Sequence, residues 1–304
     1  MTARASVVTV GTFDGVHRGH RLVLDRLSAA ARARDMRAIL VTFHAHPLAV
    51  LNPAAAPPLL SVGDERLEAL AATGVDHVAV VPFTRTLAGY EADQFVRHVL
   101  IERFAMRELF VGHDHGFGRG RSGDAAFLER LGRDFGFGVH VVPPVDGRDG
   151  RPVSSTAIRR AIAGGDLVRA ADGLGRPYSV AGVVVPGDAR GSELGYRTLN
   201  LGEPATGKLL PPDGVYAIRA DTPRGRFGGM MNLGGRPTFG DERRTLEAHL
   251  FGASGDFYGC RVRFDFLTRI RGVRRFSGRE ELMAQLARDE EAARLVVARH
   301  QAGL

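Results

Sequence analysis

Residues 6–23 read SVVTVGTFDGVHRGHRLV, an apolar run followed by a glycine-rich turn and the start of an amphipathic segment. The β-branched residues of SVVTV are typical of a buried strand. Gly11, Gly15 and Gly19 then allow the backbone to approach a ligand closely, and the N–H groups at the start of a helix attract anions. The stretch therefore predicts a strand, a tight turn and a helix whose first turn can bind phosphate.

Two histidines, His17 and His20, stand at the start of this predicted helix. Imidazole nitrogens can donate hydrogen bonds to phosphoryl oxygens, so the pair favours phosphate binding. From the residues alone, two histidines at this spacing also fit an exposed surface pair or a metal-binding pair.

Outward from this stretch, strand-like and helical patterns alternate from Ser6 to about Gly165. Such alternation predicts βαβ units, hence an α/β fold with a Rossmann-like parallel sheet. Ligands of such sheets bind beyond the carboxyl ends of the strands. We therefore expect a first domain over residues 1–165, with its chemistry in the loops at that edge.

The pattern changes after a connecting segment at residues 166–178. Short strands separated by glycine and proline turns predict an antiparallel sheet or small β-barrel over residues 179–304. In residues 261–266, Val262, Phe264 and Phe266 alternate with polar residues. The last segment spaces apolar residues as one helical stripe, which we expect to pack on the barrel; the stripe comprises Met283, Leu286, Ala293 and Val297.

Composition excludes several classes of protein. The formal charge is +7, but Lys208 is the only lysine among 41 basic residues, and no basic run is interleaved with aromatic residues. Nucleic-acid binding is therefore not expected. The single cysteine, Cys260, cannot form an intrachain disulfide, and no leader or long apolar run is present. These features predict a cytoplasmic protein without a membrane partner, and they leave self-association open.

A second phosphate-type helix start occurs in the segment VSSTAIRR. Ser154, Ser155 and Thr156 offer hydroxyl groups beside free N–H groups, and Arg159 follows one turn later. Taken alone, the segment also fits an ordinary serine cap followed by an exposed arginine.

Together, GTFDGVHRGH and VSSTAIRR resemble the two signatures of the nucleotidyltransferase superfamily, in the form carried by the FAD synthetase branch. The resemblance implies the reaction FMN + ATP → FAD + pyrophosphate, in which the FMN phosphate attacks the α-phosphorus directly with help from Mg²⁺. It implies roles for His17 and His20 at the α- and β-phosphates, and for Ser155, Thr156 and Arg159 at the β- and γ-phosphates. Further implied ATP-binding residues are Gly11, Phe13, Asp14, Gly19 and Ser154.

Two more stretches resemble parts of the flavin pocket of this family. LVTFHAHP and FVGHDHGFGRGRSGD together imply a set of flavin-binding residues, namely Phe43, His46, Pro47, Asp114 and Phe117. His115 and Gly116 stand where the family commonly has an aromatic residue and an arginine. The pair His113 and His115 also fits a metal site, although an ordinary loop is the simpler interpretation.

The segment VAGVVVPGDARGSELGYRTLNL resembles the ATP-binding segment of riboflavin kinases. The resemblance implies that Thr198 and Asn200 hold Mg²⁺ and ATP phosphates. Gly187, Arg190 and Gly191 are the implied ATP-binding residues of the preceding turn. This chain departs from the family pattern at three positions, Ser192, Arg197 and Leu199.

Strand alternation in TLEAHLF puts Leu246, Ala248 and Leu250 on one face, with Glu247 and His249 on the other. By pattern alone the second face is a solvated one. The resemblance implies instead that Glu247 takes the proton from the 5′-hydroxyl of riboflavin as it attacks the γ-phosphorus.

The order of these segments resembles the bifunctional riboflavin kinase/FMN adenylyltransferases, the prokaryotic FAD synthetases, over nearly the whole chain. We therefore expect a flavin-forming enzyme whose small-molecule substrates are ATP, riboflavin and FMN. Two alternatives follow from the departures. The chain could be a specialised paralogue that adenylylates FMN or an analogue with weak or lost kinase activity, or it could be a non-catalytic flavin- or nucleotide-binding regulator.

Overall fold

The computed structural model describes residues 4–113, 116, 123–187, 196–202, 207–236 and 241–302. Residue contacts divide the chain into two compact units, Met1–Ser155 and Thr156–Leu304. This division falls earlier than the expected boundary at residue 165. Within the expected linker, residues 167–174 form a helix, α9, that packs against strands of the second unit.

The first unit is a five-stranded, all-parallel sheet with the order β3-β2-β1-β4-β5. Its strands are β1 Ser6–Val10, β2 Arg37–Phe43, β3 His77–Val81, β4 Met106–Gly112 and β5 Gly138–Val142. Its helices are α1 Arg18–Ala33, α2 Pro47–Leu51, η1 Pro53–Ala55, α3 Gly63–Ala71, α4 Arg85–Ala88, α5 Ala92–Phe95, η2 Val96–Ile101, α6 Glu102–Phe104 and α7 Ala125–Phe135. The predicted parallel α/β sheet is confirmed.

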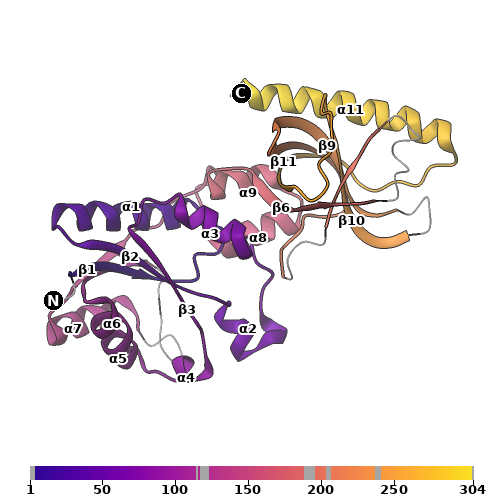
Figure 1. Ribbon diagram of the computed structural model, residues 1–304. Coiled ribbons are helices and arrows are strands. Elements are labelled where there is room, and N and C mark those ends of the chain that lie inside the picture. The colour runs from indigo at the N-terminus through magenta and orange to yellow at the C-terminus, as the bar shows by residue number, and fades with distance from the viewer. Residues whose placement is uncertain are drawn as a thin grey trace. The chain divides into compact units, whose positions relative to one another are not determined.

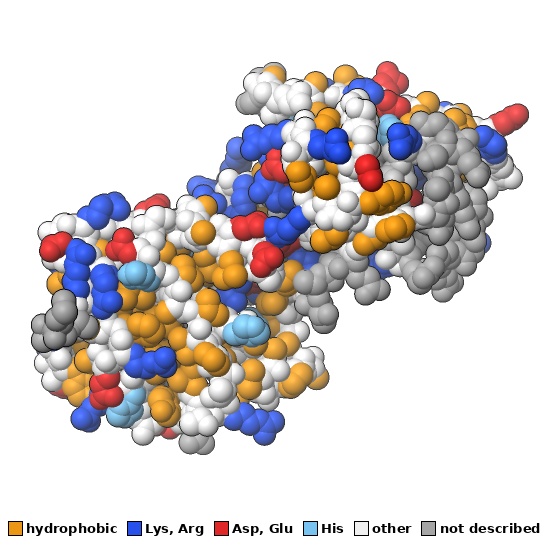
Figure 2. Space-filling view, in the orientation of Figure 1, with side chains coloured by type: hydrophobic (Ala, Val, Ile, Leu, Met, Phe, Trp, Pro, Cys, Tyr) orange, Lys and Arg blue, Asp and Glu red, His pale blue; other side chains and the backbone are white. Residues whose placement is uncertain are grey.

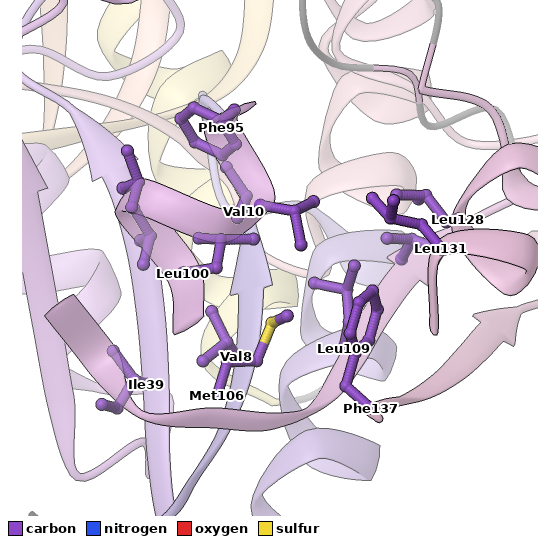
Figure 3. Close-up of a cluster of buried hydrophobic side chains, with 14 of the residues drawn as sticks. Val8, Val10, Ile39, Phe95, Leu100, Met106, Leu109, Leu128, Leu131 and Phe137 are labelled. Atoms are coloured by element: carbon purple, nitrogen blue, oxygen red, sulfur yellow. The ribbon is translucent and has the colours of Figure 1, made fainter. Parts of the chain in front are cut away.

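Helices cover both faces of this sheet, with α1 on one face and α5, α6 and α7 on the other (Figure 1). The two faces alternate along each strand, so Val7 packs towards α1 whereas Val8 packs with Leu100 and Leu128 on the opposite side (Figure 3). Because both faces are buried, the strands are apolar almost throughout, which is why they are visible as continuous runs in the sequence.

The strand order indicates where ligands of this sheet are expected to bind. β2 and β3 extend the sheet on one side of β1, and β4 and β5 extend it on the other. The topological switch point therefore lies between β1 and β4, and the crevice at their carboxyl ends is where ligands of open α/β sheets bind. The glycine turn that follows β1 lies at this point.

The second unit is a closed antiparallel barrel with the strand order β10-β7-β6-β11-β8-β9. Its elements are α8 Ser155–Ala163, α9 Leu167–Leu174, β6 Tyr178–Val185, β7 Leu199–Leu201, β8 Gly214–Thr222, β9 Gly225–Arg236, β10 Asp241–Leu250, β11 Arg261–Arg271 and α11 Arg279–Gln301. The first residue of α8 belongs to the first unit. Val262, Phe264 and Phe266 are buried in the barrel, as their alternation predicts.

The C-terminal helix α11 packs on this barrel, which confirms the prediction (Figure 1). Ala293 and Val297 are its buried apolar residues, and a Cβ atom at Gly228 of β9 would collide with Val297. Asp289, which is buried on the same helix, accepts hydrogen bonds from Arg271 at 2.7 and 3.0 Å. A close apolar contact and a buried ion pair therefore hold the helix in place.

Charged residues of opposite sign are interspersed on the face of each unit seen in Figure 2. On the barrel wall, Asp221 pairs with Arg226 at 2.7 Å and with Arg263 at 2.5 Å, and Asp265 pairs with Arg219 at 2.5 Å. Part of the basic excess is thus engaged in ion pairs within the fold. Among the described residues, no helix is both long and apolar enough to cross a membrane.

Candidate active sites

The turn between β1 and α1 is strained and firmly held. Phe13 and Val16 have positive φ values of 46° and 43°, which side-chain-bearing residues rarely adopt. The buried carboxylate of Asp14 accepts hydrogen bonds from the N–H groups of Leu60 and Ser61 at 2.9–3.0 Å. The predicted phosphate turn is therefore fixed by bonds to a segment far along the chain, and Asp14 is a structural part of it.

His17 forms the N-cap of α1. Its Nδ1 accepts a hydrogen bond from the His20 N–H at 3.3 Å, and the two rings stack with centroids 3.6 Å apart. In a neutral imidazole whose Nδ1 accepts, the proton is on Nε2, which makes Nε2 a donor. A Cβ atom at Gly19 would lie 3.2 Å from the His17 ring, so glycine keeps this site open.

His20 is held in its neutral form. Burial lowers the pKa of His20 well below its ordinary value, and the positive charges of His17, when that ring is protonated, and of Arg66 lower it further. Its Nδ1 is buried and has no hydrogen-bond partner among the described residues. His20 therefore offers hydrogen-bonding nitrogens near neutral pH rather than a positive charge.

This lowered pKa predicts a loss of stability in acid. The folded chain resists protonation of His20, so its contribution to stability is complete above the ordinary histidine pKa of about 6.5 and is lost as the pH falls below it. Between about pH 7.5 and pH 5.5 the thermal unfolding midpoint of the full chain should fall more steeply than that of His20→Asn. Circular dichroism measures both midpoints, and equal slopes would contradict the assignment.

The second phosphate-type helix start meets the first. The Ser155 hydroxyl donates a hydrogen bond to the Asp14 carbonyl at 3.0 Å, although 141 positions separate the two residues. Ser154 precedes it in the first unit. Thr156 and Arg159 continue α8, with Arg159 one turn beyond Ser155 and on the same face of the helix. Within the first unit, the structure thus places Ser155 beside the histidine turn.

Three residues predicted to line the flavin pocket lie at or just beyond the carboxyl end of β2: Phe43, His46 and Pro47. Phe43 is buried and packs edge-on against Phe83, with ring centroids 5.1 Å apart. His46 caps α2 by accepting a hydrogen bond from the Leu48 N–H at 3.2 Å, and Pro47 is the first residue of that helix. Asp114 and Phe117 lie outside the described residues, as does His115.

In the barrel, a row of polar residues crosses three neighbouring strands. Glu247 of β10 is paired with Asn200 of β7 on one side and with Asn232 of β9 on the other. Directly opposed residues of antiparallel strands point to the same face, so the three side chains share one face of the barrel wall. The Thr245 hydroxyl donates to Glu247 Oε1 at 3.2 Å. The predicted base is therefore flanked by two amides and approached by a hydroxyl.

His249 contacts the two residues that precede Thr198. Nδ1 of His249 donates to the Arg197 carbonyl at 2.9 Å, and the ring of Tyr196 packs edge-on against His249. The Arg197 side chain, at one of the departures from the family pattern, is exposed. Arg190, Gly191 and Ser192 lie outside the described residues.

Gly187 lies directly against Asn200, and a Cβ atom there would overlap the Asn200 amide. Gly187→Ala should displace that amide and lower kcat/KM for the predicted phosphorylation by about 10²-fold, with adenylyl transfer unchanged. Steady-state kinetics of the two reactions would test this. Gly278→Ala is the matched control because a Cβ atom there meets nothing within 4 Å. Equal activities of the two variants would contradict the prediction.

Comparison with known proteins relates both parts of the chain to one family. A family model described as FAD synthetase matches residues 1–157, and a model described as riboflavin kinase matches residues 174–297. The bifunctional riboflavin kinase/FMN adenylyltransferase of Escherichia coli K12 is 37% identical over 292 residues, which cover 95% of this chain and 91% of that protein. This chain belongs to the bifunctional riboflavin kinase/FMN adenylyltransferase family.

Other similar proteins extend the comparison. The bifunctional riboflavin kinase/FMN adenylyltransferase of Bacillus subtilis is 31% identical over 293 residues, covering 95% of this chain and 91% of that protein. A crystal structure from Streptococcus pneumoniae, named as a macrolide-efflux protein, superposes with a TM-score of 0.86 and 32% identity, covering 97% and 95% of the two chains. The fold of this chain is thus shared over nearly all of its length.

Three residues near these family sites were not singled out by sequence reasoning: Ser61, Arg66 and Asn232. Arg66 donates to the carbonyls of Thr12 and Phe43 at 2.6 and 2.8 Å, which ties the ends of β1 and β2 together. It stands on an ordinary helix, and nothing in the local pattern indicates those partners. Asn232 could have been found only by aligning β9 with β10, since its proximity to Glu247 depends on strand register.

Proposed function

We propose that this chain phosphorylates riboflavin to FMN and adenylylates FMN to FAD with release of pyrophosphate. The observation that carries the proposal is its whole-length relation to bifunctional enzymes, with the FAD synthetase and riboflavin kinase models matching successive parts of the chain. The first unit would perform adenylyl transfer and the barrel phosphorylation, so the product of the second unit is the substrate of the first.

For adenylyl transfer, we propose that the protein aligns the phosphates and supplies no covalent nucleophile. His17 Nε2 and His20 would donate to the α- and β-phosphates, and Ser155, Thr156 and Arg159 would bind the β- and γ-phosphates. The hydrogen bond from Ser155 to the histidine turn supports this grouping. A donor aimed at developing charge is worth about 10²–10³ in rate, so the expected catalysis needs only a few such groups.

For phosphorylation, we propose that Glu247 accepts the proton of the riboflavin 5′-hydroxyl as that oxygen attacks the γ-phosphorus of ATP. Thr198 and Asn200 offer neutral oxygen donors, which suit Mg²⁺ together with ATP phosphates and water. Gly187 leaves the Asn200 amide in place, in agreement with such a role. The ion would neutralise phosphate charge, while the chain orients the two substrates.

The test is to incubate the purified full chain with Mg-ATP and either riboflavin or FMN, and to separate the products chromatographically. Formation of FMN in the first reaction and FAD in the second is the expected result. FAD from FMN without FMN from riboflavin would favour the specialised paralogue instead. Retention of flavin without any turnover would favour the regulator and overturn the proposal.

A further inference from the structure

The phosphate turn does not hold its own shape. Phe13 and Val16 occupy the left-handed region of backbone conformations, where side-chain-bearing residues are strained, and such conformations persist only when the surroundings enforce them. The structure shows what enforces them in this chain. One short segment, Leu60–Arg66, contacts the turn through Leu60, Ser61 and Arg66, and it is called the brace below.

The first half of the brace binds the middle of the turn. The N–H groups of Leu60 and Ser61 donate to the Asp14 carboxylate, and the Ser61 hydroxyl accepts a hydrogen bond from the Gly15 N–H at 3.1 Å. Ser61 is 4% exposed and Asp14 is 2% exposed, so these bonds are shielded from competing water. They fix the Asp14 side chain and the peptide unit that follows Asp14.

The second half of the brace is Arg66, whose guanidinium reaches the start of the turn. It donates to the Thr12 carbonyl at 2.6 Å, to the Phe43 carbonyl at 2.8 Å and to the Thr42 hydroxyl. Thr42 in turn donates to the Gly11 carbonyl at 2.8 Å. One planar group therefore sets the separation of the carboxyl ends of β1 and β2, a task that matches the fixed geometry of a guanidinium.

Arg66 also acts on the histidines of the turn. Its charge is among the causes that lower the pKa of His20, after burial and His17. Burial lowers the pKa of Arg66 itself, and the Asp14 carboxylate opposes that effect. Arg66 Nε and His20 Nδ1 are both buried without a hydrogen-bond partner among the described residues. The guanidinium thus keeps one N–H group that is not used in a hydrogen bond among the described residues, beside the phosphate-type turn.

We propose that Arg66, together with Ser61, is a positioning residue for adenylyl transfer: the brace holds the turn between Gly11 and His20 in the geometry that aligns the ATP phosphates. The inference rests on the proposed function of the first unit. Arg66 acts through the turn, and the barrel reaction does not depend on it. The brace should therefore matter more to the chemical step than to the binding of FMN.

The test compares Arg66→Met and Arg66→Lys with the wild-type chain, with FMN adenylylation and riboflavin phosphorylation measured separately. Arg66→Met should lower kcat for adenylylation by about 10²-fold, because small displacements of aligned groups cost that much. KM for FMN should stay within a factor of about two and phosphorylation should be unchanged. Arg66→Lys keeps the charge but not the planar guanidinium that donates to two carbonyls at once, so it should recover only part of kcat. Millimolar methylguanidinium should partly rescue Arg66→Met.

Arg26→Met is the matched control, because Arg26 is exposed on α1 and should be replaceable without effect. Ser61→Ala removes a single hydroxyl, and it tests the brace if Arg66→Met fails to fold; its kcat should also fall with KM retained. Wild-type kcat in Arg66→Met or in a folded Ser61→Ala would overturn the inference. So would a loss that appears only in KM. A wild-type chain that forms no FAD would instead refute the proposed function.

Discussion

Glu247→Gln should abolish riboflavin phosphorylation and leave FMN adenylylation at the wild-type rate. The substitution keeps the size of the side chain and its place between Asn200 and Asn232, but an amide cannot accept the proton. Loss of general-base catalysis typically costs 10²–10⁴ in rate, so we expect kcat for phosphorylation to fall by about that range. Single-turnover assays with Mg-ATP and riboflavin would measure it.

Glu291→Gln is the matched control, because Glu291 is exposed on α11 and lies in the same unit. It should phosphorylate riboflavin at the wild-type rate. If Glu247→Gln retained more than about a tenth of wild-type kcat, Glu247 would not be the base, since a general base contributes at least about 10².

His20→Ala should have the converse effect, with adenylylation lost and phosphorylation retained. The His20 ring stacks on His17 and contacts Phe13 with centroids 4.7 Å apart, so its removal takes away one proposed phosphate ligand and the packing that orients the His17 ring. We expect kcat for FAD formation to fall by about 10²–10³, the effect of removing one well-placed donor. Steady-state assays with FMN and Mg-ATP would measure it.

His77→Ala controls for the loss of an imidazole, because His77 is exposed at the amino end of β3, at the edge of the sheet opposite the turn. It should leave both activities unchanged. Loss of both activities from either Glu247→Gln or His20→Ala, with folding intact, would refute the assignment of two separate sites.

Local patterns were enough to predict the two folds, whereas the candidate site residues took their roles from the resemblance to a known family. The parallel strands appear in the sequence as continuous apolar runs because both faces of their sheet are buried. In β10, Leu246, Ala248 and Leu250 appear as an alternating pattern because only one face of that strand is buried. The two phosphate-type helix starts are visible because capping depends on a few adjacent residues. Such signals depend on neighbours in the chain, and a single sequence displays them.

Contacts between distant segments could not be obtained in this way. Three such contacts are the bond from Ser155 to Asp14, the brace at Arg66 and the strand pairing that puts Asn232 beside Glu247. Each joins residues that no helical or strand periodicity in the sequence relates. Strand order and register bring them together, and these depend on how all the elements pack at once. The sequence by itself determined the two folds and which residue types could do chemistry. Only the tertiary structure decided which of them meet, because those contacts form by long-range packing that leaves no local pattern.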